Sequence, residues 1–334
     1  MDIKQKRISN FKDIYVMVKE FFYYRQKAVT PLKKSALVDI FISLLPCAIF
    51  GCLLFGLRAV LVLALSVVLS VGADCLCDVI FKKGFKINYS AALSGLLLGL
   101  VLSSVLNIWL VVAVVLLATL LRKTVFKDKS LIFTTPSLFA RGLLAILFIG
   151  QFGTYVVPFL NTEIYLPVET FYHSISFVGT AKMYFFGLHG GNIGETSVLL
   201  ILVGGIYLML RRIINPIIPV SFIITTAVLS LALGQNLAVS LLGSGLFFAS
   251  VFMTLGYNFM AAARYKKLLY GIVCGALTVL LRFVFKTEAV LLAVVIADFA
   301  FYCITRHNIK KMINFVKKPN FKKLLHKISK AFSV

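Results

Sequence analysis

Long apolar runs alternate with short polar and basic stretches along most of this chain. A helix needs about 20 residues to cross the roughly 30 Å hydrocarbon core of a bilayer, and shorter helices occur in bundles. Because backbone amides find no water in hydrocarbon, we expect such runs to be helices. The pattern predicts an all-α integral membrane protein with about ten transmembrane helices. The ten runs cover residues 38–56, 58–80, 89–105, 108–121, 138–159, 197–210, 217–234, 237–255, 268–281 and 287–304.

The basic residues predict the direction of these helices. With the N-terminus inside, 31 of the 35 Lys and Arg residues fall in inside segments. The other four, Arg58, Lys182, Arg282 and Lys286, fall outside. Since cytoplasmic loops carry such an excess of positive charge, we predict cytoplasmic N- and C-termini in the inner (plasma) membrane of a bacterial cell.

Composition supports this interpretation. The chain is 60% hydrophobic and 14% charged, whereas about a quarter of a soluble domain is charged. Its net charge of +23 could indicate nucleic-acid binding, but the basic residues lie between and beyond the apolar runs, so we expect membrane lipid and no nucleic acid as a partner. The basic tails, residues 1–36 and 306–334, flank a transmembrane domain at 37–305. They lie on an anionic leaflet or bind a partner protein; the sequence leaves both open.

The predicted spans fall into two equal groups. Five precede the longest outside loop, residues 160–196, and five follow it. An odd number of spans per half makes the halves enter the membrane from opposite sides. This arrangement predicts an inverted 5+5 repeat.

Motifs of soluble enzymes are absent from the sequence. There is no P-loop, nucleophile elbow, H-E-x-x-H or dinucleotide-binding fingerprint. The four histidines show no metal-ligand spacing, and the six cysteines fall in or beside apolar runs, where they are typical small apolar residues. We therefore predict no catalytic residue and no metal site.

Three acidic residues fall inside predicted spans, where an uncompensated charge is costly. Asp74 and Asp78 lie one helical turn apart in the second span, and Asp298 lies in the tenth. All three are candidates for an ion pathway. Alternatively, Asp78 forms a helix-end ion pair with Lys82, and Asp298 faces either a polar cavity or another helix.

The outside loop ends in a stretch unusually rich in glycine. Gly187, Gly190, Gly191 and Gly194 precede Thr196 and Ser197 at the start of the sixth span. Glycine lets the backbone approach a ligand closely. The Thr and Ser hydroxyls can cap the helix, and Glu195 complements its positive end. A glycine-rich turn with a cap explains each residue singly, but explains the length of the stretch less well.

This stretch carries a resemblance to a known family. Residues 191–197, Gly-Asn-Ile-Gly-Glu-Thr-Ser, are similar to the D subunit of the Rnf electron-transport complex and to its relative, the B subunit of the sodium-pumping NADH:quinone reductase. The resemblance extends in order from about residue 38 to 305, with the same ten-span topology. Other matching stretches are residues 91–99, 202–208, 213–219, 241–245 and 268–271.

The resemblance implies two flavins and a role in electron transfer. Family members carry FMN on a threonine of the outside loop through a phosphoester bond, and Thr180, after Gly179, stands at that position. They hold a second flavin, such as riboflavin, without a covalent bond, and pass electrons singly. The resemblance also makes cofactor-binding candidates of Gly190, Gly191, Gly194 and Glu195.

The sequence departs from the family pattern at several positions. Phe177 and Ala181 replace the usual Ser and Pro around the threonine. Residues 133–137 lack the usual Asn-Pro, and Thr254-Leu255-Gly256 lacks the usual Asp-Pro. These changes put the family's cofactor content in question for this chain.

Three hypotheses follow. The first is a membrane subunit of an Rnf-like, ion-translocating complex that relays electrons through flavin. This subunit would act with sister subunits as part of a translocase rather than as a self-contained enzyme. The second is a cofactor-free channel or transporter on an inverted-repeat fold. The third is a cofactor-free scaffold that assembles such a complex.

Overall fold

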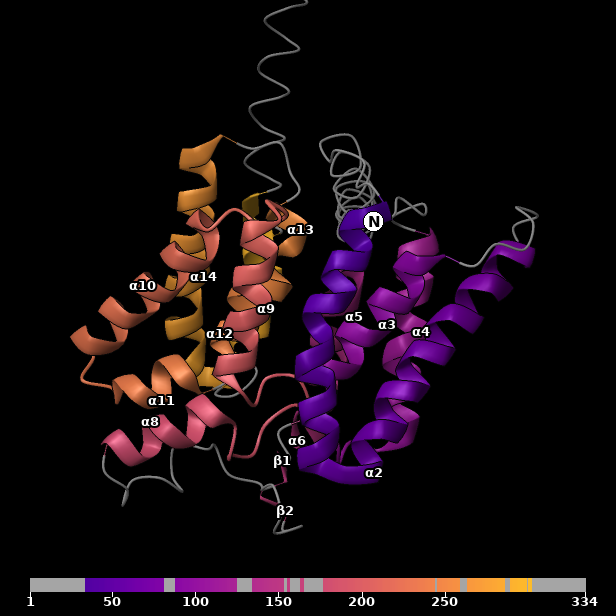
Figure 1. The fold of residues 1–334 in the computed structure, drawn as a ribbon, viewed down its shortest axis with the longest axis horizontal. Coiled ribbons are helices and arrows are strands. Elements are labelled where there is room, and N and C mark those ends of the chain that lie inside the picture. Colours follow the sequence, from indigo (N-terminus) through magenta and orange to yellow (C-terminus); the bar gives the residue numbers. More distant parts are fainter. Residues whose placement is uncertain are drawn as a thin grey trace, which may run out of the picture. The chain divides into compact units, whose positions relative to one another are not determined.

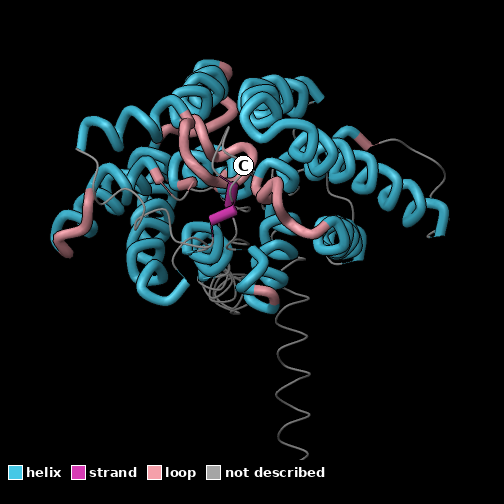
Figure 2. Tube along the Cα trace, turned by 90° about the horizontal axis from the view of Figure 1, so that it is seen from below, coloured by secondary structure: helices cyan, strands magenta, loops and turns pink. Residues whose placement is uncertain are grey.

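The computed structural model describes residues 34–80, 88–124, 134–152, 155–156, 163–164, 177–243, 245–258, 263–285, 289–298 and 300–301. Nearly all of them are helical, as expected, and Figure 2 shows one short pair of strands among the helices. The chain divides into two compact units, residues 26–297 and residues 1–25 with 298–334. The predicted basic tails fall mostly outside the described residues, so their placement stays a prediction.

The first helix, α2 (Lys34–Ile80), is broken at Gly56, whose φ of 68° and ψ of −156° are not helical. A side chain is strained at such a φ, so glycine suits the break. Figure 1 shows α2 folding back on itself at its lower end. The break lies at the expected boundary between the first two spans, which are the two arms of α2.

Four short helices and a strand pair follow. They are α3 (Tyr89–Leu100), α4 (Ile108–Thr124), α5 (Thr134–Leu147), α6 (Ile149–Phe152), β1 (Tyr155–Val156) and β2 (Glu163–Ile164). The two strands are antiparallel, with Tyr155 opposite Ile164. The third and fifth spans were expected to reach residues 105 and 159, so both predictions were too long. The α3 helix stops at Leu100 because a tertiary contact uses the next carbonyls: Leu100 O and Leu102 O accept hydrogen bonds from Gly194 and Ile193.

The remaining elements begin inside the expected outside loop. They are α8 (Phe177–Phe186), α9 (Val198–Leu210), α10 (Ile217–Ala232), α11 (Leu237–Leu242), α12 (Leu246–Phe248), the π-helix η1 (Ala249–Met253), α13 (Leu255–Asn258), α14 (Arg264–Phe285) and an unlabelled helix, Ala289–Asp298. The α8 helix lies within the stretch expected as an outside loop, residues 160–196.

The eighth predicted span, residues 237–255, is not one continuous helix. It stops at Leu242, Gly243 is extended, and Gly245 is left-handed with a φ of 66°. A Cβ at Gly245 would overlap the Glu195 carboxyl group, so the break leaves space for this acidic side chain. The span resumes as α12 and η1. Single turns of π-helix are rare in proteins, and those that occur are often found at functional sites.

Helix length and surface both bear on the membrane prediction. Among the described helices, only Ser35–Ile80 combines the length and hydropathy of a membrane span, and it is the broken α2; five others are apolar but 10–17 residues long. Their outward side chains are apolar, such as Leu53, Val203 and Ile224, whereas Asp74 and Arg122 are buried. Charge inside and hydrocarbon outside is the arrangement expected in a lipid solvent.

Candidate functional site

Four charged side chains are buried together between α2 and α4. This ion quartet consists of Asp74, Asp78, Arg122 and Lys123. Arg122 pairs with Asp74, and the Lys123 Nζ lies 3.0 Å from Asp74 Oδ1 and 2.6 Å from Asp78 Oδ1. Two positive charges therefore compensate two negative ones.

Neutral groups complete the quartet. Asn88 Nδ2 donates to Asp74 Oδ2 at 2.7 Å, and an Arg122 nitrogen donates to Ser90 Oγ at 3.1 Å. The expected partner of Asp78, Lys82, lies outside the described residues. The observed partners come from α4; Lys123, for example, follows Asp78 by 45 residues in the sequence. This arrangement favours a structural link between α2 and α4 over an open ion pathway for Asp74 and Asp78.

The second polar region is the glycine-rich segment, defined as residues 187–197. Its backbone is held by two hydrogen bonds to the residues that end α3: Ile193 N to Leu102 O at 3.1 Å and Gly194 N to Leu100 O at 2.7 Å. On the other side it touches α2, where a Cβ at Gly51 would overlap the Ile193 carbonyl oxygen. The segment is therefore clamped between two elements of the first half of the chain.

Two polar side chains of this segment form a hydrogen-bonded pair, and one of them lies at the break after α11. Asn192 Nδ2 donates to Glu195 Oε2 at 2.7 Å, and the Glu195 carboxyl lies against Gly245. Both residues are buried, with 4% and 8% exposure. Asn192 Oδ1 has no hydrogen-bond partner among the described residues.

His189 is the third buried polar residue of the segment. Its ring lies 4.4 Å from that of Tyr184 on α8, tilted by 59°, and its Nδ1 has no hydrogen-bond partner in the described part of the chain. Burial lowers the pKa of His189 to about 3, because desolvation disfavours the charged imidazolium. The histidine is therefore neutral near pH 7.

The sequence comparisons place the chain in a family. A match to the NQR2, RnfD, RnfE family covers residues 28–314. The chain belongs to this family. It is a family of membrane proteins, and its known members carry flavin. The resemblance inferred from residues 191–197 is therefore confirmed.

Individual relatives are similar to different extents. The chain is 29% identical over 255 residues to the D subunit of the Na(+)-translocating ferredoxin:NAD(+) oxidoreductase complex of Acetobacterium woodii, covering 74% of this chain and 80% of that protein. It is 39% identical over 106 residues to the D subunit of an ion-translocating oxidoreductase complex of Stutzerimonas stutzeri, covering 29% and 30%. It is 32% identical over 108 residues to the D subunit of the proton-translocating ferredoxin:NAD(+) oxidoreductase complex of Clostridium ljungdahlii, covering 30% and 33%.

The residues expected to bind cofactor fall in two neighbouring elements. Thr180 and Gly179 lie in the first turns of α8, and Thr180 precedes Tyr184 by one turn. Gly190, Gly191, Gly194 and Glu195 lie in the glycine-rich segment. Ser197 caps α9 as expected, accepting from Leu200 N at 3.5 Å. Asp298 is buried at the end of its helix, in the other compact unit.

Several residues of these two regions were not anticipated from the sequence. Arg122, Lys123 and Asn88 complete the quartet, and Tyr184, His189 and Asn192 line the second region. One signal was present: Ser66, Ser70, Asp74 and Asp78 recur every four residues, so they share one helix face, and all four are buried. Within the described residues, no group of three or more His, Cys, Asp or Glu side chains is placed to hold a metal ion.

Proposed function

We propose that this chain is the D-type membrane subunit of an Rnf-like, ion-translocating electron-transport complex, with FMN attached to Thr180. Family membership and the Acetobacterium relative, matched over four fifths of its length, support the subunit assignment. Electron transfer then needs partner subunits as donor and acceptor, and membrane lipid around the apolar helix faces.

The carrying observation is the placement of Thr180. It lies one turn, about 6 Å along the helix axis, before Tyr184, whose ring contacts His189 of the glycine-rich segment. The position that the family uses for attachment is therefore adjacent to the segment on which the resemblance rests. These two features lie on consecutive parts of the chain, α8 and the segment that follows it directly.

The local chemistry fits FMN. Thr180 lies near the N-terminus of a ten-residue helix, whose positive dipole favours a phosphate. One turn on, Tyr184 is buried with its ring against that of His189, whose Nδ1 has no hydrogen-bond partner among the described residues. When bound, FMN supplies one-electron transfer. The chain's own residues hold the group and shield it from water.

Two kinds of contact support the inverted repeat. The first arm of α2 meets α9, where a Cβ at Gly204 would lie 2.5 Å from Ser43 O. In the same way, a Cβ at Gly142 of α5 would lie 3.1 Å from Leu291 Cδ2. These contacts join the first span to the sixth and the fifth to the tenth, which is compatible with a pseudo-two-fold axis between the two halves. The third span of each half, α3 and α11, is also interrupted.

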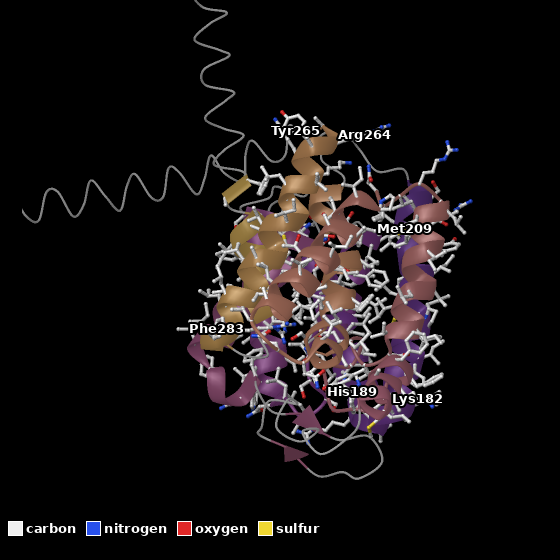
Figure 3. The ribbon with its side chains drawn as sticks, turned by 90° about the vertical axis from the view of Figure 1, so that its left-hand side faces the viewer. Lys182, His189, Met209, Arg264, Tyr265 and Phe283 are labelled. Carbon is white, nitrogen blue, oxygen red and sulfur yellow. The ribbon has the colours of Figure 1, made fainter. Side chains whose placement is uncertain are left out.

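The ends of the helices at which certain residues lie support the proposed orientation. Figure 3 shows Lys182 and His189 at one end of the helices, with Arg264, Tyr265 and Met209 toward the opposite end. The basic end would face the cytoplasm of a bacterial cell, and the Thr180 end would face outside.

One observation favours the second candidate, a cofactor-free channel or transporter. Two interrupted spans meet at the glycine-rich segment, and discontinuous helices form the substrate and ion sites of many transporters. This candidate predicts the same fold without flavin.

The test is the fluorescence of the full-length chain on a denaturing gel. The chain should be produced with the flavin-attaching machinery of an Rnf-containing host. We expect a fluorescent band under ultraviolet light, because a covalent phosphoester survives detergent. Thr180→Ala should be dark, whereas Thr124→Ala, a threonine on α4, should fluoresce like the original chain. A dark original chain would overturn covalent attachment and favour the second candidate.

A further inference from the structure

The first turn of α14 carries positive charge that the helix itself disfavours. Arg264, Lys266 and Lys267 lie there, and the turn contains no acidic residue. Because the N-terminal end of a helix is the positive end of its dipole, cations at this end weaken the helix. The structure shows no ion pair for Arg264 or Lys266 within the described residues. These two charges are therefore available to an anion from outside the chain.

A further arginine lies at the same end of the helices. A Cβ at Gly271 would lie 2.8 Å from Ile218 O, and a Cβ at Gly275 would lie 3.0 Å from Phe222 O. Both steps are four residues long, so α10 and α14 run parallel and begin at the same end. The turn that leads into α10 contains Arg212, which is exposed and has no ion pair in the described part of the chain.

An exposed apolar stripe follows these charges along α14. Tyr265, Leu269, Ile272, Leu280 and Phe283 are exposed and recur at helical spacing, so they share one face. Figure 3 shows Tyr265 at one end of the molecule and Phe283 toward the other. From Leu269 to Leu280 the helix rises about 16 Å, which is close to the roughly 15 Å hydrocarbon thickness of one leaflet. A single acyl chain therefore matches this part of the stripe in length.

We propose that Arg212, Arg264 and Lys266 bind the headgroup of one anionic phospholipid of the cytoplasmic leaflet, with an acyl chain along the stripe. Tyr265 is 66% exposed, and the Lys266 Nζ lies 5.9 Å from its ring centroid. Tyrosine rings of this kind sit at headgroup level. A lipid with an anionic head and an apolar tail matches both the charges and the stripe, whereas an acidic soluble protein would match the charges alone.

This inference rests on the membrane orientation proposed above, but it uses neither the flavin nor the glycine-rich segment. Thr180→Ala should therefore bind the lipid normally while losing the fluorescent band, so that the two proposals can fail separately.

The test counts lipids bound to the purified full-length chain by native mass spectrometry. The chain is titrated with phosphatidylglycerol or with phosphatidylethanolamine, a neutral lipid, carrying the same acyl chains. We expect the first phosphatidylglycerol to bind at least about tenfold more tightly. This preference should shrink as ammonium acetate is raised, since salt screens exposed charges. Glycerol phosphate, which has no acyl chain, should bind more weakly than the anionic lipid; equal binding would indicate a phosphate site and overturn the lipid proposal.

Variants assign the effect to the patch. Each basic residue near an anionic surface strengthens binding about fivefold, so Arg264→Gln and Lys266→Gln together should weaken phosphatidylglycerol binding about 25-fold. Binding of phosphatidylethanolamine should not change. Lys182→Gln is the matched control, because it removes one exposed positive charge at the opposite end of the helices, and it should keep the full preference.

If the double variant does not fold, the two single variants decide, each with a loss of about fivefold. Equal affinity of the original chain for both lipids, or unchanged phosphatidylglycerol binding in the patch variants, would overturn the proposal. Loss of partner subunits from these variants with unchanged lipid affinity would also overturn it, and would assign the patch to an acidic protein.

Discussion

The two buried polar regions differ in how their charges are compensated. In the ion quartet, Arg122 and Lys123 neutralise Asp74 and Asp78, and Asn88 fills a remaining position. In the glycine-rich segment, Asn192 Oδ1 and His189 Nδ1 are buried without partners among the described residues. Both regions are buried. In the quartet the opposite charges pair with one another, although Arg122 Nε has no hydrogen-bond partner among the described residues.

This difference separates structure from function. A set of buried charges that pair with one another links two helices and has no net charge left to compensate. A region held in place by backbone contacts at Gly51 and Leu100, yet left with unpartnered polar atoms, retains the capacity to bind a ligand. The sequence pointed to both regions as candidates, and the contacts distinguish them.

The largest expected effect comes from breaking the quartet. Arg122→Ala leaves Asp74 buried next to a single remaining cation, and removing one partner of a buried pair costs about 3–5 kcal/mol. We expect a large drop in the denaturant or thermal midpoint of the purified chain. Arg211→Ala is the matched control: Arg211 pairs with Asp39 at 3.2 Å, but its side chain is 55% exposed. Its loss should be smaller, since the Arg211 side chain is largely solvated and Asp39 keeps the hydrogen bond from the Tyr207 hydroxyl at 2.7 Å. Equal losses would mean that the quartet is not structurally important.

A smaller effect is expected from a methyl group at the break. Gly245→Ala adds both the strain of a left-handed φ, about 1–2 kcal/mol, and an overlap with the Glu195 carboxyl. Gly234→Ala separates these terms, because Gly234 has nearly the same φ of 67° with open space around its Cβ. The free energy of unfolding of Gly245→Ala should therefore be lower than that of Gly234→Ala by at least about 1 kcal/mol, the usual lower bound for overpacking. Denaturant unfolding of the two purified variants measures this difference. Identical losses would show that Glu195 does not fill the break.

The smallest effect, at mildly acidic pH near 5.5, concerns the protonation of His189. Its pKa is about 3 in the folded chain and 6.5 in the reference state, so the unfolded chain binds a proton first as pH falls. The stabilisation is fully present above pH 6.5 and is lost between pH 6.5 and 3, by about 1.4 kcal/mol per pH unit. At pH 5.5 the cost is about 1.4 kcal/mol.

A substitution isolates this contribution. His189→Phe keeps an aromatic ring beside Tyr184 but cannot take up a proton, so its stability should fall less between pH 6.5 and 5 than that of the original chain. His326→Phe, in the C-terminal tail, should leave the original slope in place. The hypothesis fails if the slopes of all three proteins coincide.

Much of the fold could be predicted from the order of apolar runs. The break at Gly56, the start of α4 at Ile108 and the end of α9 at Leu210 lie at or next to the expected limits. These ends follow local features that a sequence displays, namely glycine, polar residues and basic pairs. The ends of α3 and α11 were missed, because each is determined by a contact with the distant glycine-rich segment.

The candidate site was predictable in part. Thr180 and four residues of the glycine-rich segment were named as candidates because the family resemblance is carried by consecutive residues; the four are Gly190, Gly191, Gly194 and Glu195. Arg122, Tyr184 and His189 were not found, since each matters only through a neighbour that is distant in sequence or lies across a turn. An unpartnered atom such as Asn192 Oδ1 is defined by what surrounds it, so no linear pattern reveals it.

By itself, the sequence determined that this is a helical membrane protein of a known family. The lengths of the apolar runs, the placement of basic residues and one glycine-rich run can be read from the chain alone. The first two reflect the free energy of transferring side chains between water and lipid. The tertiary structure decided how buried charges are compensated. That depends on which side chains meet: Asp74 pairs with Arg122, whereas Glu195 accepts a hydrogen bond from the Asn192 amide nitrogen and lies against Gly245 at a broken helix.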